Sequence, residues 1–363
     1  MILVAGASGL VGRALVEVLS SGRRPWIELS RRPRAIVDDG SGTAAAACDV
    51  TDPSALLRAI PEARSIVHVA GVAPGAKPER GDHELAAMRA LLELARARKP
   101  ERFIFLSATG ADPGASDRWL RAKGEAERLL RASGLPFVVL RASLVVGADS
   151  PALGALMQVV RAGVKLKLPL LRGGSLRPIA EGDVAIALAS ALDHHRMVGE
   201  TVELGAEPAV TLDELLTRVA QRLRQQLSLS RVPFVGHPLA RLLERVPSRP
   251  LTDGAGFVRL FALLEPPTLA LYDRLIPMRR TLLIDALRSM PWGEPPPRPG
   301  DPLPTIREPE ESGIPRIIPV ESLRSTGGPP ALPPSFYGRT DAFGRPVGDE
   351  RSSHASDSSD DPA

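Results

Sequence analysis

The sequence predicts an α/β protein built on a doubly wound parallel sheet, and two observations carry this prediction. Short apolar runs alternate with helical patterns from Met1 to about Arg141. The first run, at 1–5, leads directly into the glycine-rich stretch 6–12, and a helical pattern follows. Strands that alternate with helices need crossover connections, which produce a parallel sheet covered by helices on both faces.

The spacing of apolar residues gives the elements in order. Apolar runs bounded by turn residues indicate strands, and apolar side chains that recur every three or four positions indicate helices. After 1–5, the expected strands are 26–30, 66–70, 102–107, 137–141 and 201–204, and the expected helices include about 82–98 and 117–132. The helix after the glycine turn should end at Ser21-Gly22, because glycine commonly closes a helix.

The second half of the chain is more mixed. Gly182-Asp183 opens an expected helix, with Asp183 as its first-turn carboxylate. Thr211 and Glu214 have the spacing of a capping box, which predicts a helix over 215–223. Beyond residue 232, short helical patterns are separated by prolines.

The composition of the last 71 residues differs from the rest, because they hold 15 of the 36 prolines and end in serine and aspartate. Such a segment buries too little apolar surface to offset the entropy of ordering it. We therefore expect a Rossmann-type domain with insertions at 1–232, a small C-terminal helical lobe at 233–292 and a disordered tail at 293–363.

The composition argues against several classes of protein. A net charge of +4 without a dense basic patch does not call for nucleic-acid binding. Cys48 is the only cysteine, so no disulfide framework or cysteine zinc site is expected, and no spacing of His, Asp and Glu suggests a metal. No long uncharged apolar run predicts a membrane span, and a strand that begins at Met1 leaves no room for a signal peptide. A cytoplasmic location is expected.

The stretch 278–288 is expected to form a basic amphipathic helix that covers the core or, alternatively, lies on a membrane surface.

The glycine turn predicts a site for a dinucleotide. A strand, a glycine-rich turn and a helix in this order direct backbone N–H groups and the positive end of the helix at one point, which suits a pyrophosphate. In this interpretation Gly6 makes the turn, Gly9 admits the phosphates and Gly12 lets helix and strand pack closely. The alternative is an ordinary βα turn. The candidate residues are Gly6, Ser8, Gly9, Leu10, Val11 and Gly12.

Two further stretches indicate how the nucleotide would be recognised. Ser30, Arg31 and Arg32 follow the second strand, where a guanidinium suits a 2′-phosphate and an acidic residue would suit a 2′-hydroxyl. NADP(H) is therefore preferred over NAD(H), which remains possible; the alternative is a solvated arginine run. Asp49 and Val50 follow the next strand and could read the adenine edge, although Asp49 or Asp52 could instead cap a helix.

Together these motifs resemble a known family. The stretches that carry the resemblance are 6–12, 48–52, 67–71, 105–110, 118–123, 141–147 and 177–179. They are similar to the atypical, extended (epimerase-like) members of the short-chain dehydrogenase/reductase superfamily, over roughly residues 1 to 230. The stretch 199–205, with the Thr211 capping box, looks most like the branch that includes the nucleotide-binding accessory subunit of respiratory complex I and its bacterial relatives. The resemblance adds Ala70 and Gly71 to the expected cofactor site.

The resemblance also implies a catalytic set, from which this chain departs. Active members pair a tyrosine with a lysine four residues later, and the lysine bonds the nicotinamide ribose and lowers the pKa of the tyrosine. Lys123 and the family's serine, Ser107, are present, but Trp119 replaces the tyrosine. An indole N–H only donates and cannot exchange the substrate proton. The alternative for Lys123 is a surface lysine paired with Glu127, four residues later.

Three functions remain open at this point. The first is a binding protein that holds NADP(H) as a structural or sensing ligand and contacts a protein partner through its C-terminal helices or tail. The second is a tyrosine-independent reductase of a quinone-like or activated-alkene acceptor. The third, a sugar-nucleotide epimerase or dehydratase, requires the missing tyrosine. The sequence does not indicate a substrate.

His68 is expected to be a core histidine with satisfied hydrogen bonds, and His83 and Glu84 could face the nicotinamide side.

Overall fold

The computed structural model describes residues 1–31, 43–71, 79–165, 168–171, 175–227, 229–232 and 268–289. The expected tail, 293–363, lies outside these residues. A seven-stranded sheet has the order β11-β6-β5-β4-β1-β2-β3, and all neighbouring strands are parallel. Its strands are β1 (Ile2–Ala5), β2 (Trp26–Ser30), β3 (Ala44–Ala47), β4 (Ser65–His68), β5 (Arg102–Ala108), β6 (Phe137–Ala142) and β11 (Thr201–Leu204). The prediction of a doubly wound α/β fold is confirmed.

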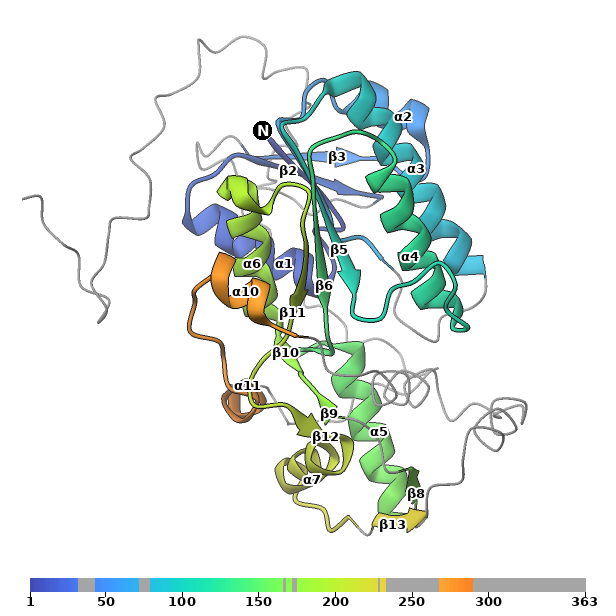
Figure 1. The fold of residues 1–363 in the computed structure, drawn as a ribbon, viewed down its shortest axis with the longest axis vertical. Helices are drawn as coiled ribbons and strands as arrows, with labels where there is room; N and C mark the ends of the chain where they lie inside the picture. The colour runs from blue at the N-terminus through green and yellow to red at the C-terminus, as the bar shows by residue number, and fades with distance from the viewer. Residues whose placement is uncertain are drawn as a thin grey trace, which may run out of the picture. The chain divides into compact units, whose positions relative to one another are not determined.

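Helices cover both faces of this sheet (Figure 1). One face carries α1 (Leu10–Ser21), α6 (Glu181–Asp193) and α10 (Ala270–Leu275), and the other carries α2 (Pro53–Ala59), α3 (Glu79–Arg98) and α4 (Arg118–Arg131). The helix α1 ends before Gly22, as expected. The strand expected at 66–70 ends at His68, which leaves Val69, Ala70 and Gly71 in a loop at the carboxyl edge of the sheet.

A second apolar cluster lies in the smaller lobe. It is built from α5 (Pro151–Lys165), α7 (Leu212–Arg222), α11 (Leu283–Ser289) and short strand pairs. The pairs are β7 (Val145–Val146) with β10 (Ile179–Ala180), β9 (Ser175–Leu176) with β12 (Val210–Thr211), and β8 (Leu168–Leu171) with β13 (Leu229–Val232). The 3₁₀ helix η1 (His195–Met197) follows α6. The Thr211–Glu214 capping box is present, and Thr211 is the N-cap, so α7 begins at Leu212, earlier than expected.

The segment 268–289 contacts both apolar clusters. Tyr272 is fully buried in the cluster under α1 and α6, whereas Leu283 and Leu287 are buried in the cluster of the smaller lobe. Between these anchors, the carboxylate of Asp183 accepts hydrogen bonds from the backbone N–H of Thr281 at 2.7 Å and from its hydroxyl at 2.9 Å. The first-turn carboxylate of α6 therefore holds the C-terminal segment in place.

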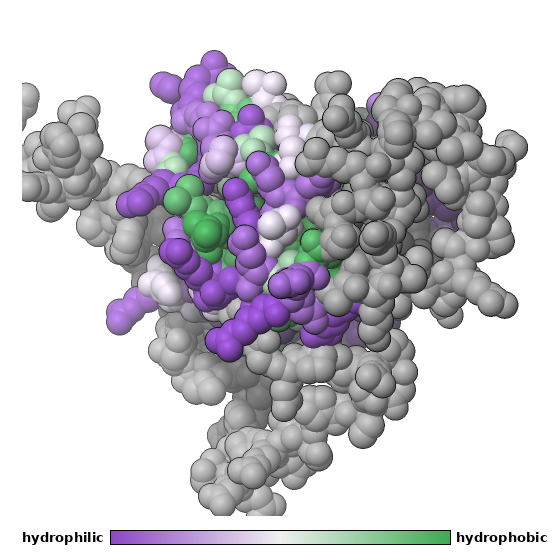
Figure 2. All heavy atoms as spheres, turned by 90° about the horizontal axis from the view of Figure 1, so that it is seen from below, coloured by the Kyte–Doolittle hydropathy of each residue, from purple (hydrophilic) through white to green (hydrophobic). Residues whose placement is uncertain are grey.

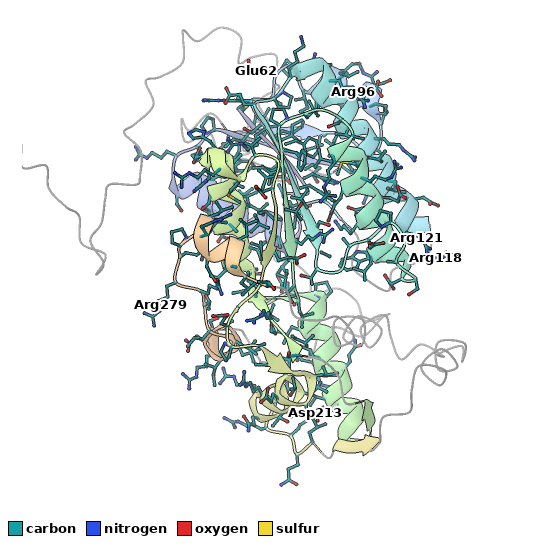
Figure 3. All side chains as sticks on the ribbon, viewed as in Figure 1. Glu62, Arg96, Arg118, Arg121, Asp213 and Arg279 are labelled. Atoms are coloured by element: carbon teal, nitrogen blue, oxygen red, sulfur yellow. The ribbon has the colours of Figure 1, made fainter. Side chains whose placement is uncertain are left out.

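The expected basic helix at 278–288 does not form as a whole, because α11 begins only at Leu283. Arg280 pairs with Asp273 and lies over the ring of Tyr272, 4.6 Å from its centroid. Arg279 points away from the ribbon (Figure 3). The bonds between Thr281 and Asp183 engage backbone and side chain outside a helix, which explains the late start of α11.

His68 is a buried core histidine, as expected, but it is not satisfied. Its ring stacks on Phe105 with centroids 5.3 Å apart, and neither ring nitrogen has a hydrogen-bond partner among the described residues. Burial lowers the pKa of His68 from 6.5 to about 4. The imidazole is therefore neutral near pH 7.

Replacement of Asp183 by alanine should detach the C-terminal segment. We expect Asp183→Ala to lower the free energy of unfolding by about 2 kcal/mol, because a buried acceptor of two hydrogen bonds is lost. Urea denaturation measures this change, and proteolysis should cut 268–289 more readily. Asp193→Ala, at the exposed end of the same helix, removes a surface pair with Arg24 and should cost less than about 1 kcal/mol. Equal losses in the two variants would contradict this role of Asp183.

The buried His68 should make folding stability depend on pH. Between about pH 6.5 and about pH 4 the unfolded chain binds a proton that the folded chain excludes, so stability falls as the pH falls through this window. The slope contributed by His68 reaches about 1.4 kcal/mol per pH unit. In urea titrations at several pH values, His68→Leu should flatten this slope. The same replacement at the exposed His195 should leave it unchanged.

Candidate functional site

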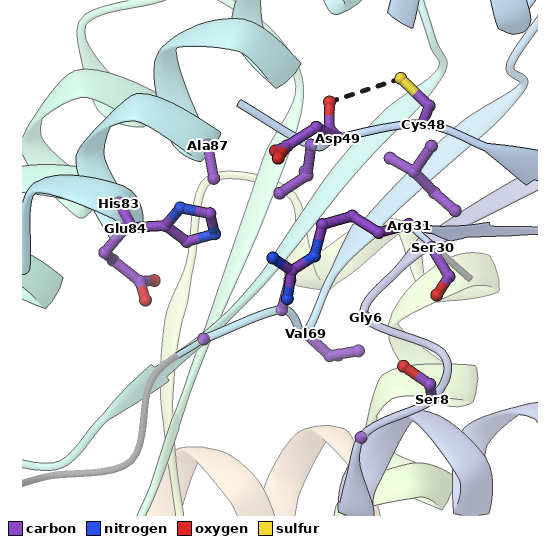
Figure 4. A pocket seen from close by; sticks show the side chains of 15 residues that line it. Gly6, Ser8, Ser30, Arg31, Cys48, Asp49, Val69, His83, Glu84 and Ala87 are labelled. Atoms are coloured by element: carbon purple, nitrogen blue, oxygen red, sulfur yellow. Dashed lines mark hydrogen bonds between the residues drawn. The ribbon is translucent and has the colours of Figure 1, made fainter. Parts of the chain in front are cut away.

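A pocket of about 270 Å³ lies at the carboxyl edge of the sheet, where β1 and β4 lie side by side (Figure 4). Successive connections leave these two strands toward opposite edges of the sheet, and ligands of open α/β sheets bind at such a point. The wall consists of Gly6, Ser8, Gly9, Leu29, Ser30, Arg31, Cys48, Asp49, Val50, Val69, Ala70, Gly71, His83, Glu84 and Ala87.

The glycine turn has no room for side chains. Gly6 has φ +98°, and a Cβ there would lie 2.4 Å from the backbone nitrogen of Ala70. A Cβ at Gly12 would lie 2.1 Å from the Gly6 carbonyl oxygen. Gly9 is the N-cap of α1 and provides no side-chain cap. The N–H groups of the first turn therefore remain available for an anion at the floor of the pocket.

Arg31 and Asp49 line the wall beside the second and third strands. The guanidinium of Arg31 extends into the pocket (Figure 4), and Arg32 lies outside the described residues. One carboxylate oxygen of Asp49 accepts hydrogen bonds from the Thr51 backbone and hydroxyl at 2.9 and 2.8 Å. These bonds lower the pKa of Asp49. Helix capping falls to Asp52, whose side chain accepts from the Ala55 N–H and so caps α2.

The first turns of α3 form the facing wall with His83, Glu84 and Ala87. His83 lies on the side of Asp49, where its charge contributes to the low pKa of that carboxyl. The sequence offered His83 and Glu84 as residues that could face the ligand, and the helical spacing of 83, 84 and 87 could have added Ala87. Cys48 and Val69 lie within the stretches that carry the family resemblance but were not singled out as site residues, and neither was Leu29.

The three expected catalytic positions do not line the pocket. The hydroxyl of Ser107 donates to Glu127 at 2.6 Å, and the fully buried Glu127 also accepts from Arg131 and Arg141. These bonds raise the pKa of the Arg141 guanidinium. Trp119, in the first turn of α4, packs against the apolar cluster of the smaller lobe.

Lys123 lies beneath the pocket, in contact with its wall. Its ammonium group donates to one oxygen of Glu84 at 2.7 Å and to the Leu106 carbonyl at 3.1 Å. Lys123 is 6% exposed and Glu84 is 3% exposed, so this ion pair is buried. The interpretation of Lys123 as a surface lysine paired with Glu127 is wrong. Among the other expected residues, Leu10, Val11 and Gly12 lie at the start of α1, behind the pocket lining.

The described ranges hold no cluster of His, Cys, Asp and Glu that could bind a metal, and none of their helices is long and apolar enough to cross a membrane. Figure 2 views the described surface from below and shows hydrophilic side chains around small apolar patches.

Comparisons with known proteins agree with the pocket. Residues 6–195 match the model of a family described as NAD(P)H-binding. The photosystem II assembly factor Ycf39 of Cyanophora paradoxa is 28% identical over 141 residues, which is 39% of this chain and 44% of that protein. The chain thus spans less than half the length of this curated relative.

Solved structures of sugar-nucleotide epimerases share the fold. The UDP-glucose 4-epimerase of Thermotoga maritima superposes with a TM-score of 0.59 at 16% identity, over 78% of this chain and 95% of that chain. A nucleoside-diphosphate-sugar epimerase of Staphylococcus aureus gives 0.60 at 16% identity, over 79% and 99%. The resemblance to the atypical short-chain dehydrogenases/reductases is confirmed, and this chain belongs to the NAD(P)H-binding family.

Proposed function

We propose that the chain binds NADP(H) in the pocket as a structural or sensing ligand and does not use it in tyrosine-dependent turnover. One observation carries the proposal: the pocket brings together the glycine turn, Arg31 and Asp49, while all three family catalytic positions are engaged elsewhere or replaced. Ser107 is bonded to Glu127, Lys123 is paired with Glu84, and Trp119 stands in place of tyrosine.

The residues present fit a dinucleotide. The glycine turn leaves space and N–H groups for a diphosphate, and Asp49 keeps one carboxylate oxygen outside its bonds to Thr51 for an adenine amine. Arg31 supplies a guanidinium that suits a 2′-phosphate, which supports NADP(H) over NAD(H). When bound, the cofactor would supply hydride chemistry, and the chain's own groups would hold and orient it.

An accessory role beside a protein partner is consistent with a cofactor that is bound and not consumed. The relative from Cyanophora paradoxa is described as an assembly factor, and we extend an accessory role of this kind to the present chain. The partner surface would involve the C-terminal region, as the sequence suggested. An epimerase activity is disfavoured despite the shared fold, because no tyrosine occupies the proton-transfer position.

The cofactor preference can be tested by titration. NADPH and NADH are added to the purified chain while tryptophan emission is followed. We expect Arg31→Ala to weaken NADPH binding by about 10- to 100-fold, because a charge-assisted hydrogen bond is lost, and to leave NADH binding nearly unchanged. Arg96→Ala, at an exposed position far along α3, is the matched control. Equal losses for both nucleotides would contradict the 2′-phosphate interpretation.

The absence of turnover can be tested by restoring the tyrosine. We expect Trp119→Tyr to bind NADPH without oxidising it in the presence of ketones, because Lys123 and Ser107 remain held by Glu84 and Glu127. Absorbance at the reduced-nicotinamide band measures the reaction. Ketone-dependent oxidation by the variant would instead indicate a dehydrogenase site disabled by one replacement. Quinone-dependent oxidation by the native chain would favour the tyrosine-independent reductase.

A further inference from the structure

Within the described part of the chain, one buried carboxylate oxygen in the pocket wall accepts no hydrogen bond. The Oε1 atom of Glu84 accepts from Lys123, but Oε2 has no hydrogen-bond partner among the described residues. The residue is 97% buried, since its exposure is 3%, and it lines the pocket. An unsatisfied charged oxygen in such a position is costly, and the ion pair offsets this cost only at the other oxygen.

The neighbours of Oε2 show which part of the pocket this oxygen faces. A Cβ on Gly71 would lie 3.3 Å from Oε2 and 3.1 Å from the ammonium nitrogen of Lys123. The carboxylate and the ammonium group thus lie close against the backbone of Gly71, where a side chain would crowd both of them. Figure 4 shows Glu84 reaching inward from α3, on the side of the pocket away from Ser30.

The side of the pocket on which Glu84 lies belongs to the half of the sheet that contains β4 and β5. Gly71 follows β4, and Lys123 lies on α4, which follows β5, whereas Arg31 and Asp49 follow β2 and β3. A dinucleotide lies across the point where the two halves meet, with one nucleoside on each half. If Arg31 and Asp49 hold the adenosine half, Glu84 faces the sugar on the other side of the diphosphate.

We propose that Glu84 Oε2 accepts hydrogen bonds from the ribose hydroxyls of the second nucleoside, and that Lys123 acts as a positioning residue behind it. This inference rests on the proposed function. A carboxylate that only accepts suits the two hydroxyl donors of a ribose, and it disfavours a phosphate or carboxylate at this end. Lys123 fixes the carboxylate through Oε1, and its bond to the Leu106 carbonyl and its position 4.8 Å above the Phe105 ring fix the lysine in turn.

Binding of three nucleotides tests this assignment. ADP contains only the adenosine half, ADP-ribose adds the second ribose, and NADPH adds the nicotinamide. We expect Glu84→Gln to weaken ADP-ribose and NADPH by about tenfold or more and to leave ADP within about twofold, measured by calorimetry. In this variant the amide oxygen stays with Lys123 and an NH₂ donor faces the pocket. Glu93→Gln, at an exposed position on the same helix, should change none of the three.

A second variant keeps the test valid if Glu84→Gln folds poorly. Glu84→Leu combined with Lys123→Met replaces both members of the buried pair by apolar groups of similar size, which commonly preserves the fold. It should also bind ADP normally and lose the gain from the second ribose. Selective loss in either folded variant supports the proposal.

The possible failures are distinguishable. If the native chain binds none of the three nucleotides, the proposed function fails. If the native chain binds them and the variants lose ADP and ADP-ribose equally, or lose neither, the proposed function stands and the role of Glu84 is overturned. In that case the ion pair of Glu84 and Lys123 only holds α3 against α4.

Discussion

The pocket depends on the close approach of two backbones at the carboxyl edge of the sheet. The Ala5 carbonyl at the end of β1 accepts hydrogen bonds from the N–H groups of both Val69 and Ala70, at 2.9 and 2.7 Å. This contact presses the loop after β4 against Gly6, where even a methyl group would overlap the Ala70 backbone. A larger residue at Gly6 would separate the two strands at the point where the pocket forms. The same glycine sets the direction in which α1 leaves the sheet, and so places the free N–H groups of α1.

Buried carboxylates connect the layers that surround this contact. Glu84 ties α3 to α4 through Lys123, Glu127 ties α4 to β5 and β6 through Ser107 and Arg141, and Asp183 ties α6 to the C-terminal segment. Each of these carboxylates has lost most of its hydration, so its partners are needed to keep the charge buried. Two of the four side chains that bond to Glu84 and Glu127, Ser107 and Lys123, stand at positions that the family resemblance assigns to catalysis. Both side chains are therefore engaged in bonds that hold the helices and the sheet together.

The sequence predicted the parts of the site that depend on local chemistry. Gly6 and Gly9 were identified because a strand, a turn and a helix follow one another within the first part of the chain, and Thr211 because a capping box spans only four residues. The partner of Lys123 could not be predicted in this way. Glu127 lies one helical turn from Lys123, but Glu84 lies 39 residues earlier on another helix, and only packing brings it close. The expected helix at 278–288 failed for a similar reason, since the distant Asp183 bonds Thr281 outside a helix.

The replacement at position 119 is more informative when the neighbouring bonds are considered with it. If the tyrosine were the only family residue affected, the serine and the lysine would be unbonded and able to act on a substrate. Here the serine hydroxyl is bonded to a fully buried glutamate, and the lysine ammonium is paired with a carboxylate that itself lines the pocket. The tryptophan is partly buried and packs against the apolar cluster of the smaller lobe. All three positions thus contribute to the packing of the protein beside the pocket, which is the arrangement that the proposed binding role requires.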